Sequence, residues 1–178
     1  FAAAGAGAYL SVRQMEASLR QLEINGLMRQ RFSVTFNVDD VDKAVTDLKA
    51  QLGNRLTKQE AFEIALKVDK TSVLTDLTEL GAVIKVIQGY ATAYGLEWKG
   101  VSLQVIEAIN QVDGSFLENG GYIDSAKGAL VEYAEAHGTT YQALTKTEQQ
   151  QALINALFEK LGPIAADAKT PVDNLAGA

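Results

Sequence analysis

Residues 130–161 read LVEYAEAHGTTYQALTKTEQQQALINALFEKL, which is the pattern of two helices joined by a His-Gly-Thr-Thr corner. The second helix has its own start signal, because Thr145 and Glu148 have the spacing of a capping box. Behind this signal apolar side chains recur at helical spacing, and three glutamines fill the polar face; these are Ala152, Leu153, Ala156, Leu157 and Leu161, with Gln149, Gln150 and Gln151. No side chain in this stretch is suited to chemistry, so the pattern predicts a packing element.

Similar signals predict helices in the preceding part of the chain. Further helices are indicated by apolar periodicity, by aspartate or serine residues at their starts, and by a capping box at Thr57 and Glu60. They cover residues 9–22, 39–52 and 57–66, a long helix that starts between residues 72 and 76 and ends at 95, and a region that opens at Trp98. Asn25-Gly26 is a plausible end for the first of them, although Leu27 and Met28 could continue it. In the long helix Gly81 and Gly89 lie on the same side, where small residues let a neighbouring helix approach closely.

Residues 31–38, RFSVTFNV, alternate between apolar and polar side chains and predict an extended segment. Phe32, Val34, Phe36 and Val38 would then point to one side. A single strand needs a partner, which could be another copy of the chain or a segment outside it. The alternative, an extended connector with its apolar side on the helices, is slightly favoured, because no second run alternates as clearly.

Taken together, these elements predict an all-α fold. We expect a helical bundle of short antiparallel helices, preceded by an amphipathic helix and one extended segment. A boundary near residues 53–56 divides an N-terminal arm, residues 1–54, from a compact helical module, residues 55–178. The apolar stripe of Val12, Met15, Leu19 and Leu22 has no obvious partner within the chain, which favours self-association through a coiled seam over folding back onto later helices.

The composition of the chain limits the kinds of partner that it is expected to bind. The 178 residues include 16 basic and 22 acidic side chains, a net charge of −6, so the chain lacks the basic field that strong nucleic-acid binding requires. The basic residues nearest to a cluster, Arg13, Arg20, Arg29 and Arg31, are expected to form a solvated helix face. There is no cysteine for disulfides or thiolate metal sites, and no apolar run approaches the roughly 20 residues of a membrane span.

Candidate chemical groups have simpler structural explanations. His137, the single histidine, follows a helix and is expected to cap its C-terminal end. Glu97, beside Trp98, is the best candidate for a general acid of glycoside hydrolysis, but a helix start explains it better. Asp113 and Glu118 lack the further ligands of a calcium loop. We therefore assign no catalytic, cofactor-binding or metal-ligating residue and expect that the protein is not an enzyme.

The same sequence carries a family resemblance. Residues 132–158, EYAEAHGTTYQALTKTEQQQALINALF, resemble a segment of tape-measure proteins of long-tailed bacteriophages, in which an "E-YA---G-----LT--E--QAL-NA" run follows a pair of amphipathic helices. Upstream, LTKQEAFEIALKV at residues 56–68 resembles the family's short segment ending in an Ala-rich helix. ELGAVIKVIQGYATAYGLEWKGVSLQVIEAIN at residues 79–110 resembles its helix pair. The resemblance covers roughly residues 56–175 and is most specific in the final helix pair.

One loop departs from the family pattern. The family often has a "RGSP---DNLGI" loop after the second helix, where this chain has NQVDGSFLENGGYID at residues 110–124. A break rich in Gly and Asn is retained but its chemistry differs, so no role specific to this loop is carried over from the family.

The resemblance implies a structural and assembly role. Several copies of a tape-measure protein run through the lumen of the tail tube, where the protein's length sets tail length. The protein also scaffolds tube assembly and leaves during genome ejection. Expected partners are other copies of the chain, tail-tube and tail-tip proteins and tail assembly chaperones. The expected location is the virion tail, and the host cytoplasm during assembly.

Two other classes of function stay open. One is a cell-wall-degrading or membrane-perturbing module of a phage tail protein, and the other is a helical adaptor unrelated to phage. Phe1 stands where an initiator Met is expected, and the sequence stops at Asn174-Leu-Ala-Gly-Ala without a terminating pattern. We therefore expect the chain to be a fragment of a longer protein.

Overall fold

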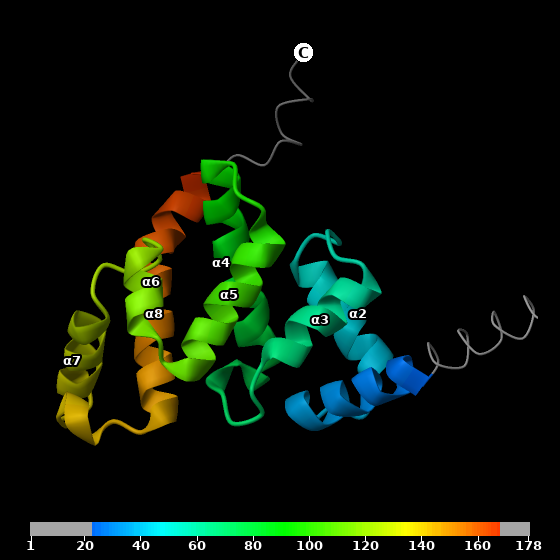
Figure 1. Cartoon of the computed structure of the whole chain (residues 1–178), viewed down its shortest axis with the longest axis horizontal. Coiled ribbons are helices and arrows are strands. Elements are labelled where there is room, and N and C mark those ends of the chain that lie inside the picture. Colours follow the sequence, from blue (N-terminus) through cyan, green and yellow to red (C-terminus); the bar gives the residue numbers. More distant parts are fainter. Residues whose placement is uncertain (1–22, 168–178) are drawn as a thin grey trace, which may run out of the picture.

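The computed structural model describes residues 23–167, and within them helices follow one another with no strand (Figure 1). A helix over residues 23–36, here called the N-terminal helix, precedes α2 (Val41–Gln51), α3 (Lys58–Lys67), the 3₁₀ turn η1 (Val73–Thr75), α4 (Leu77–Tyr94), α5 (Trp98–Gln111), α6 (Gly114–Asn119), α7 (Ala126–Ala136), the 3₁₀ turn η2 (Tyr141–Ala143) and α8 (Lys146–Asp167). The all-α prediction is confirmed. The amphipathic helix expected over residues 9–22, with its apolar stripe, lies outside the described residues.

Helix α4 lies at the centre of the arrangement. It packs against α5, α8 and α2, while α7 lies on the outer side of α8 (Figure 1). Side chains of α4, α5 and α8, such as Leu80, Ile106 and Leu153, are completely buried in one hydrophobic cluster. Buried residues from both sides of the expected boundary near residues 53–56 belong to this cluster. The division into an arm and a module stays a prediction.

The extended segment expected over residues 31–38 is wrong, because the N-terminal helix continues through residue 36. Phe32 and Phe36 are 1% and 6% exposed, whereas Val34 between them is 66% exposed. Residues two apart share a face in a strand, but residues four apart share a face in a helix. Met28, Phe32 and Phe36 therefore form a helical stripe, and Phe32 packs edge-on against Phe62 of α3, with ring centroids 5.5 Å apart.

The N-terminal helix ends at residues 36–38, where the backbone leaves the helical conformation. Asn37 has a φ of +50°, in the left-handed region where asparagine is tolerated better than most side chains. The backbone N–H of Val38 donates to the carbonyl of Ser33, and the Ser33 hydroxyl donates to the carbonyl of Val38. Asn25-Gly26 does not end the helix, and the alternative continuation through Leu27 and Met28 is confirmed.

Helix starts lie where their caps predict them. Thr57 and Glu60 form the complete capping box at the start of α3, with the Thr57 N–H 2.7 Å from Glu60 Oε2. Thr145 and Glu148 make the same reciprocal bonds at the start of α8. Asp40 caps α2 by accepting from the N–H of Lys43. These side chains satisfy backbone N–H groups that have no partner inside their own helix.

Ion pairs join neighbouring helices. Arg29 on the N-terminal helix donates to both carboxylate oxygens of Asp42 on α2, and Lys58 of α3 pairs with the same carboxylate. Hydrogen bonds from Arg29 and then Lys58 lower the pKa of Asp42 far below its usual range. Arg29 thus links two helices while its side chain stays 41% exposed, in keeping with the solvated position predicted for it.

Acid should weaken the fold through Glu60. A hydrogen bond from Lys99 of α5, followed by those from Thr57, lowers the pKa of Glu60 from 4.5 to about 2. A carboxylate with a lowered folded-state pKa stabilises the fold above its unfolded pKa, and this contribution is lost as pH falls from about 4.5 towards 2. We expect the melting temperature of Glu60→Gln to fall less than that of the wild type over this window in thermal unfolding followed by circular dichroism.

Glu63→Gln, on the same helix, is the matched control for Glu60→Gln. Glu63 is exposed and accepts a hydrogen bond from the neutral side chain of Gln59, so this variant should keep the wild-type pH dependence. Identical acid profiles for Glu60→Gln and the wild type would show that the Lys99 pair does not stabilise the fold.

The two glycines of α4 face different helices, α2 at Gly81 and α8 at Gly89, so the prediction that they lie on the same side is wrong, while close packing is found at Gly89. A Cβ built on Gly89 would lie 2.4 Å from Ala165 Cβ and 2.7 Å from Ala165 Cα on α8. At Gly81 the nearest atom is the flexible end of the Gln51 side chain on α2, which can move away. Gly89 therefore sets how near α8 can lie, whereas Gly81 is the more tolerant position.

Gly89→Ala should destabilise the protein by about 1–3 kcal/mol, because the added methyl group meets the backbone of α8. Gly26→Ala is the control, since a Cβ on Gly26 has no atom within 4 Å and alanine favours the helix by about 0.5–1 kcal/mol. Urea denaturation of both variants measures the two effects. Stabilisation by both substitutions would contradict the close contact of α4 with α8.

Candidate binding groove

The carboxylates singled out in the sequence are helix caps. Glu97 accepts from the N–H groups of Lys99 and Gly100 at the start of α5, at 3.0 and 2.6 Å. Asp113 accepts from the N–H of Phe116 at the start of α6, and Glu118 accepts from the N–H of Ala126 at the start of α7. Helix-start explanations are thus confirmed for Glu97 and extend to the other two carboxylates.

The structure does not bring Glu97 together with Asp113. Glu97 and Asp113 flank opposite ends of the 14-residue helix α5, which is roughly 20 Å long at 1.5 Å per residue. A pair of glycosidase carboxylates lies within about 5–10 Å. Among residues 23–167, no group of three or more His, Cys, Asp or Glu side chains could hold a metal ion.

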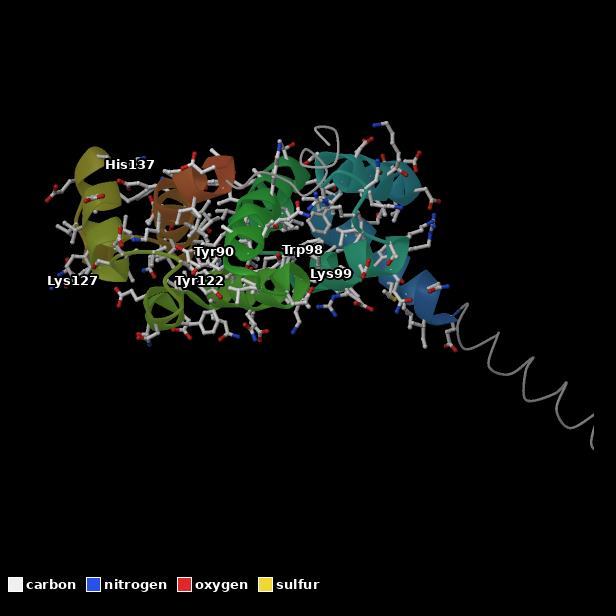
Figure 2. The ribbon with its side chains drawn as sticks, turned by 90° about the horizontal axis from the view of Figure 1, so that it is seen from above. Tyr90, Trp98, Lys99, Tyr122, Lys127 and His137 are labelled. Atoms are coloured by element: carbon white, nitrogen blue, oxygen red, sulfur yellow. The ribbon has the colours of Figure 1, made fainter. Side chains whose placement is uncertain are left out.

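His137 lies at the end of α7, far along the molecule from Trp98 and Lys99 at the start of α5 (Figure 2). It is the C-cap residue, and its ring stacks on Tyr133 with centroids 4.1 Å apart. Its Nδ1 lies 2.7 Å from the carbonyl oxygen of Tyr133. The predicted capping position of His137 is confirmed.

A large hollow lies between the N-terminal helix and the ends of three other helices. We call it the basic groove, and its volume is about 1090 Å³. The lining side chains are Leu27, Gln30, Arg31, Val34 and Thr35 of the N-terminal helix; Leu66, Lys67, Val68, Asp69 and Lys70 from the end of α3 and the turn after it; Glu107, Asn110 and Gln111 of α5; and Lys146 at the start of α8.

Positive charge exceeds negative charge in the lining of the basic groove. Four of the lining side chains are cationic and two are anionic, in a chain whose net charge is −6. Lys67 pairs with Glu107 at 3.1 Å, and Arg31 donates to the carbonyl of Leu66. Hydrogen bonds from Thr71, and to a lesser extent the charges of Lys146 and Lys70, lower the pKa of Asp69.

Beneath the basic groove, two amides tie helix ends together. Asn110 Nδ2 donates to the carbonyl of Lys67 at the end of α3, at 2.6 Å. The completely buried Gln150 of α8 donates from Nε2 to the carbonyl of Asn110 at 3.1 Å and accepts at Oε1 from the N–H of Val73 in η1 at 3.3 Å. These are terminal backbone groups without partners inside their own helices, so the amides fix the floor of the groove.

Sequence reasoning missed both the groove and its floor. Gln150 was expected on the polar face of α8 with Gln149 and Gln151, which is wrong for Gln150. The available signal was weak: Leu27 and Val34 lie seven residues apart, two helical turns, but fell inside segments predicted to behave differently.

The fold defines the class of this protein: it is all-α, with an open groove beside its N-terminal helix. No family model matches the chain, and no curated protein or solved structure matches it either. No helix among residues 23–167 has the length and apolar character needed to cross a membrane.

Proposed function

We propose that this chain is a structural and assembly module of a phage tail tape-measure protein. The observation that carries the proposal is the sequence resemblance of residues 132–158, which form the C-terminal part of α7, the turn η2 and roughly the first half of α8. The other two resembling segments correspond to α3 and to the α4–α5 pair. In this role the protein helps to set tail length, scaffolds assembly of the tail tube and takes part in genome ejection.

Physical properties of the chain are compatible with this role. An α-helix advances 1.5 Å per residue, so helical stretches of a long protein convert residue number into length. Residues 23–167 form compactly packed helices, which suits a folded module beside such a ruler. A net charge of −6 disfavours adhesion to the DNA that passes through a tail.

Proposed partners follow from the same role. They are other copies of the chain, tail-tube and tail-tip proteins, and the chaperones of tail assembly. The proposed location is the tail of the virion, after assembly in the host cytoplasm. Mass spectrometry of purified particles from the phage that encodes the chain should then detect peptides of residues 23–167.

Tail length in engineered phage tests the proposal directly. An in-frame deletion in the encoding gene that removes about 60 helical residues from the protein should shorten tails by roughly 90 Å in electron micrographs. An in-frame duplication of the same segment is the matched variant and should lengthen tails by the same amount. Tails of unchanged length in both strains would overturn the ruler role.

The same strains separate the competing functions. Tails of normal length with lost infectivity, together with digestion of purified cell wall by the chain, would favour the cell-wall-degrading alternative. A full-length protein of only a few hundred residues, or a gene without tail genes beside it, would favour the unrelated helical adaptor.

A further inference from the structure

We infer that the basic groove is a docking site for an acidic amphipathic helix of a partner protein. The residues of the groove favour this occupant whatever the function of the whole protein. The partner helix would carry an apolar stripe about two turns long, flanked by carboxylates.

The exposed apolar side chains of the groove lie on the N-terminal helix. Leu27 and Val34 are 60% and 66% exposed and lie seven residues apart, so they project from the same face at an interval of two turns. Both line the basic groove. Exposed apolar side chains repeated at this interval are the anchors that a partner helix uses when it lies in a groove.

The positive charge of the groove favours a partner with negative charge. After Lys67 pairs with Glu107, the lining keeps Arg31, Lys70 and Lys146 against Asp69. Because the whole chain is acidic, this local excess of positive charge stands out from its surroundings. Carboxylates along one edge of the incoming helix would complement it.

Other occupants fit these residues less well. A nucleic-acid backbone would have to lie against the apolar side chains of Leu27 and Val34 and against the carboxylates of Asp69 and Glu107. A small molecule would contact only part of the lining, since the volume of about 1090 Å³ lies at the upper end of the usual range of small-molecule pockets. A helix supplies apolar area and carboxylates together.

Selection from a displayed library of 20-residue helical peptides, mixed in charge and apolar pattern, tests the inference. Peptides that bind the wild-type chain should carry apolar residues at i, i+3 or i+4, and i+7, with a net negative charge. Fluorescence anisotropy should then show binding at least about tenfold weaker to Lys70→Glu/Lys146→Glu, and weaker binding at high salt.

A matched double variant controls for charge alone. Lys85→Glu/Lys127→Glu makes the same change at two other exposed lysines. Lys127 lies on α7, at the end of the molecule opposite the N-terminal helix (Figure 2). Binding of the selected peptides should be unchanged by it. Val34→Asp should weaken binding at least about tenfold and leave the fold intact, because Val34 is exposed.

Three results would overturn the inference. The first is enrichment of basic or purely polar peptides. The second is loss of peptide binding in both double variants alike. The third is binding of another class of partner in the groove. That partner would be either a 30-base-pair DNA duplex or a second copy of the chain, the latter detected by light scattering. In either case Lys70→Glu/Lys146→Glu would abolish its binding.

Discussion

Replacing Phe32 by alanine should lower the free energy of unfolding by about 3–5 kcal/mol. Phe32 is 1% exposed, and its ring centroid lies 4.7 Å from that of Phe36 and 5.5 Å from that of Phe62. The ring joins the N-terminal helix to α3, so alanine leaves a cavity at that contact. Guanidinium denaturation followed by far-ultraviolet circular dichroism measures the change.

Val34→Ala is the informative control, since Val34 lies two residues away but is 66% exposed. Its effect on stability should stay within about 0.5 kcal/mol. In an extended segment Phe32 and Val34 would share a face, and both substitutions would cost stability. Similar large losses in the two variants would therefore contradict the helix and restore the extended segment.

Helix starts could be predicted because their signals are local. The capping boxes at Thr57 and Thr145 depend on a side chain and a backbone N–H only three residues apart. No other part of the fold is needed to satisfy them. The close-packing glycine Gly89 was also predictable as a small residue on an apolar face, although its neighbour Ala165 was not.

The N-terminal helix was mispredicted because its signal is ambiguous. Residues 31–38 alternate as a strand does, yet Met28, Phe32 and Phe36 also have helical spacing. What decides between them is Phe62, thirty residues further along the chain, which packs against Phe32. A pattern within one segment does not contain that contact.

The groove and its floor depend on similar long-range contacts. Gln150 bonds to residues 77 and 40 positions earlier in the chain, at Val73 and Asn110. Its neighbours Gln149 and Gln151 have the same side chain but are only partly buried. The packing of α8 against α5 and η1 makes the middle glutamine different.

Gln150→Leu should therefore destabilise the protein by about 2–5 kcal/mol, although leucine is apolar and favours helices. Leucine cannot accept from the N–H of Val73 or donate to the carbonyl of Asn110. Each polar group left without a partner inside the protein costs about 1–3 kcal/mol. Urea denaturation measures the loss, and hydrogen exchange should show faster exchange at the amide of Val73.

Gln151→Leu separates this effect from the general effect of removing an amide from α8. Gln151 is partly buried and donates to Glu79 and Asn155, so its replacement should cost no more than about 1 kcal/mol. Equal stability of the Gln150→Leu variant and the wild type would mean that Gln150 does not tie the helix ends together. Because the same bonds fix the floor of the basic groove, selected peptides should also bind Gln150→Leu more weakly than Gln151→Leu.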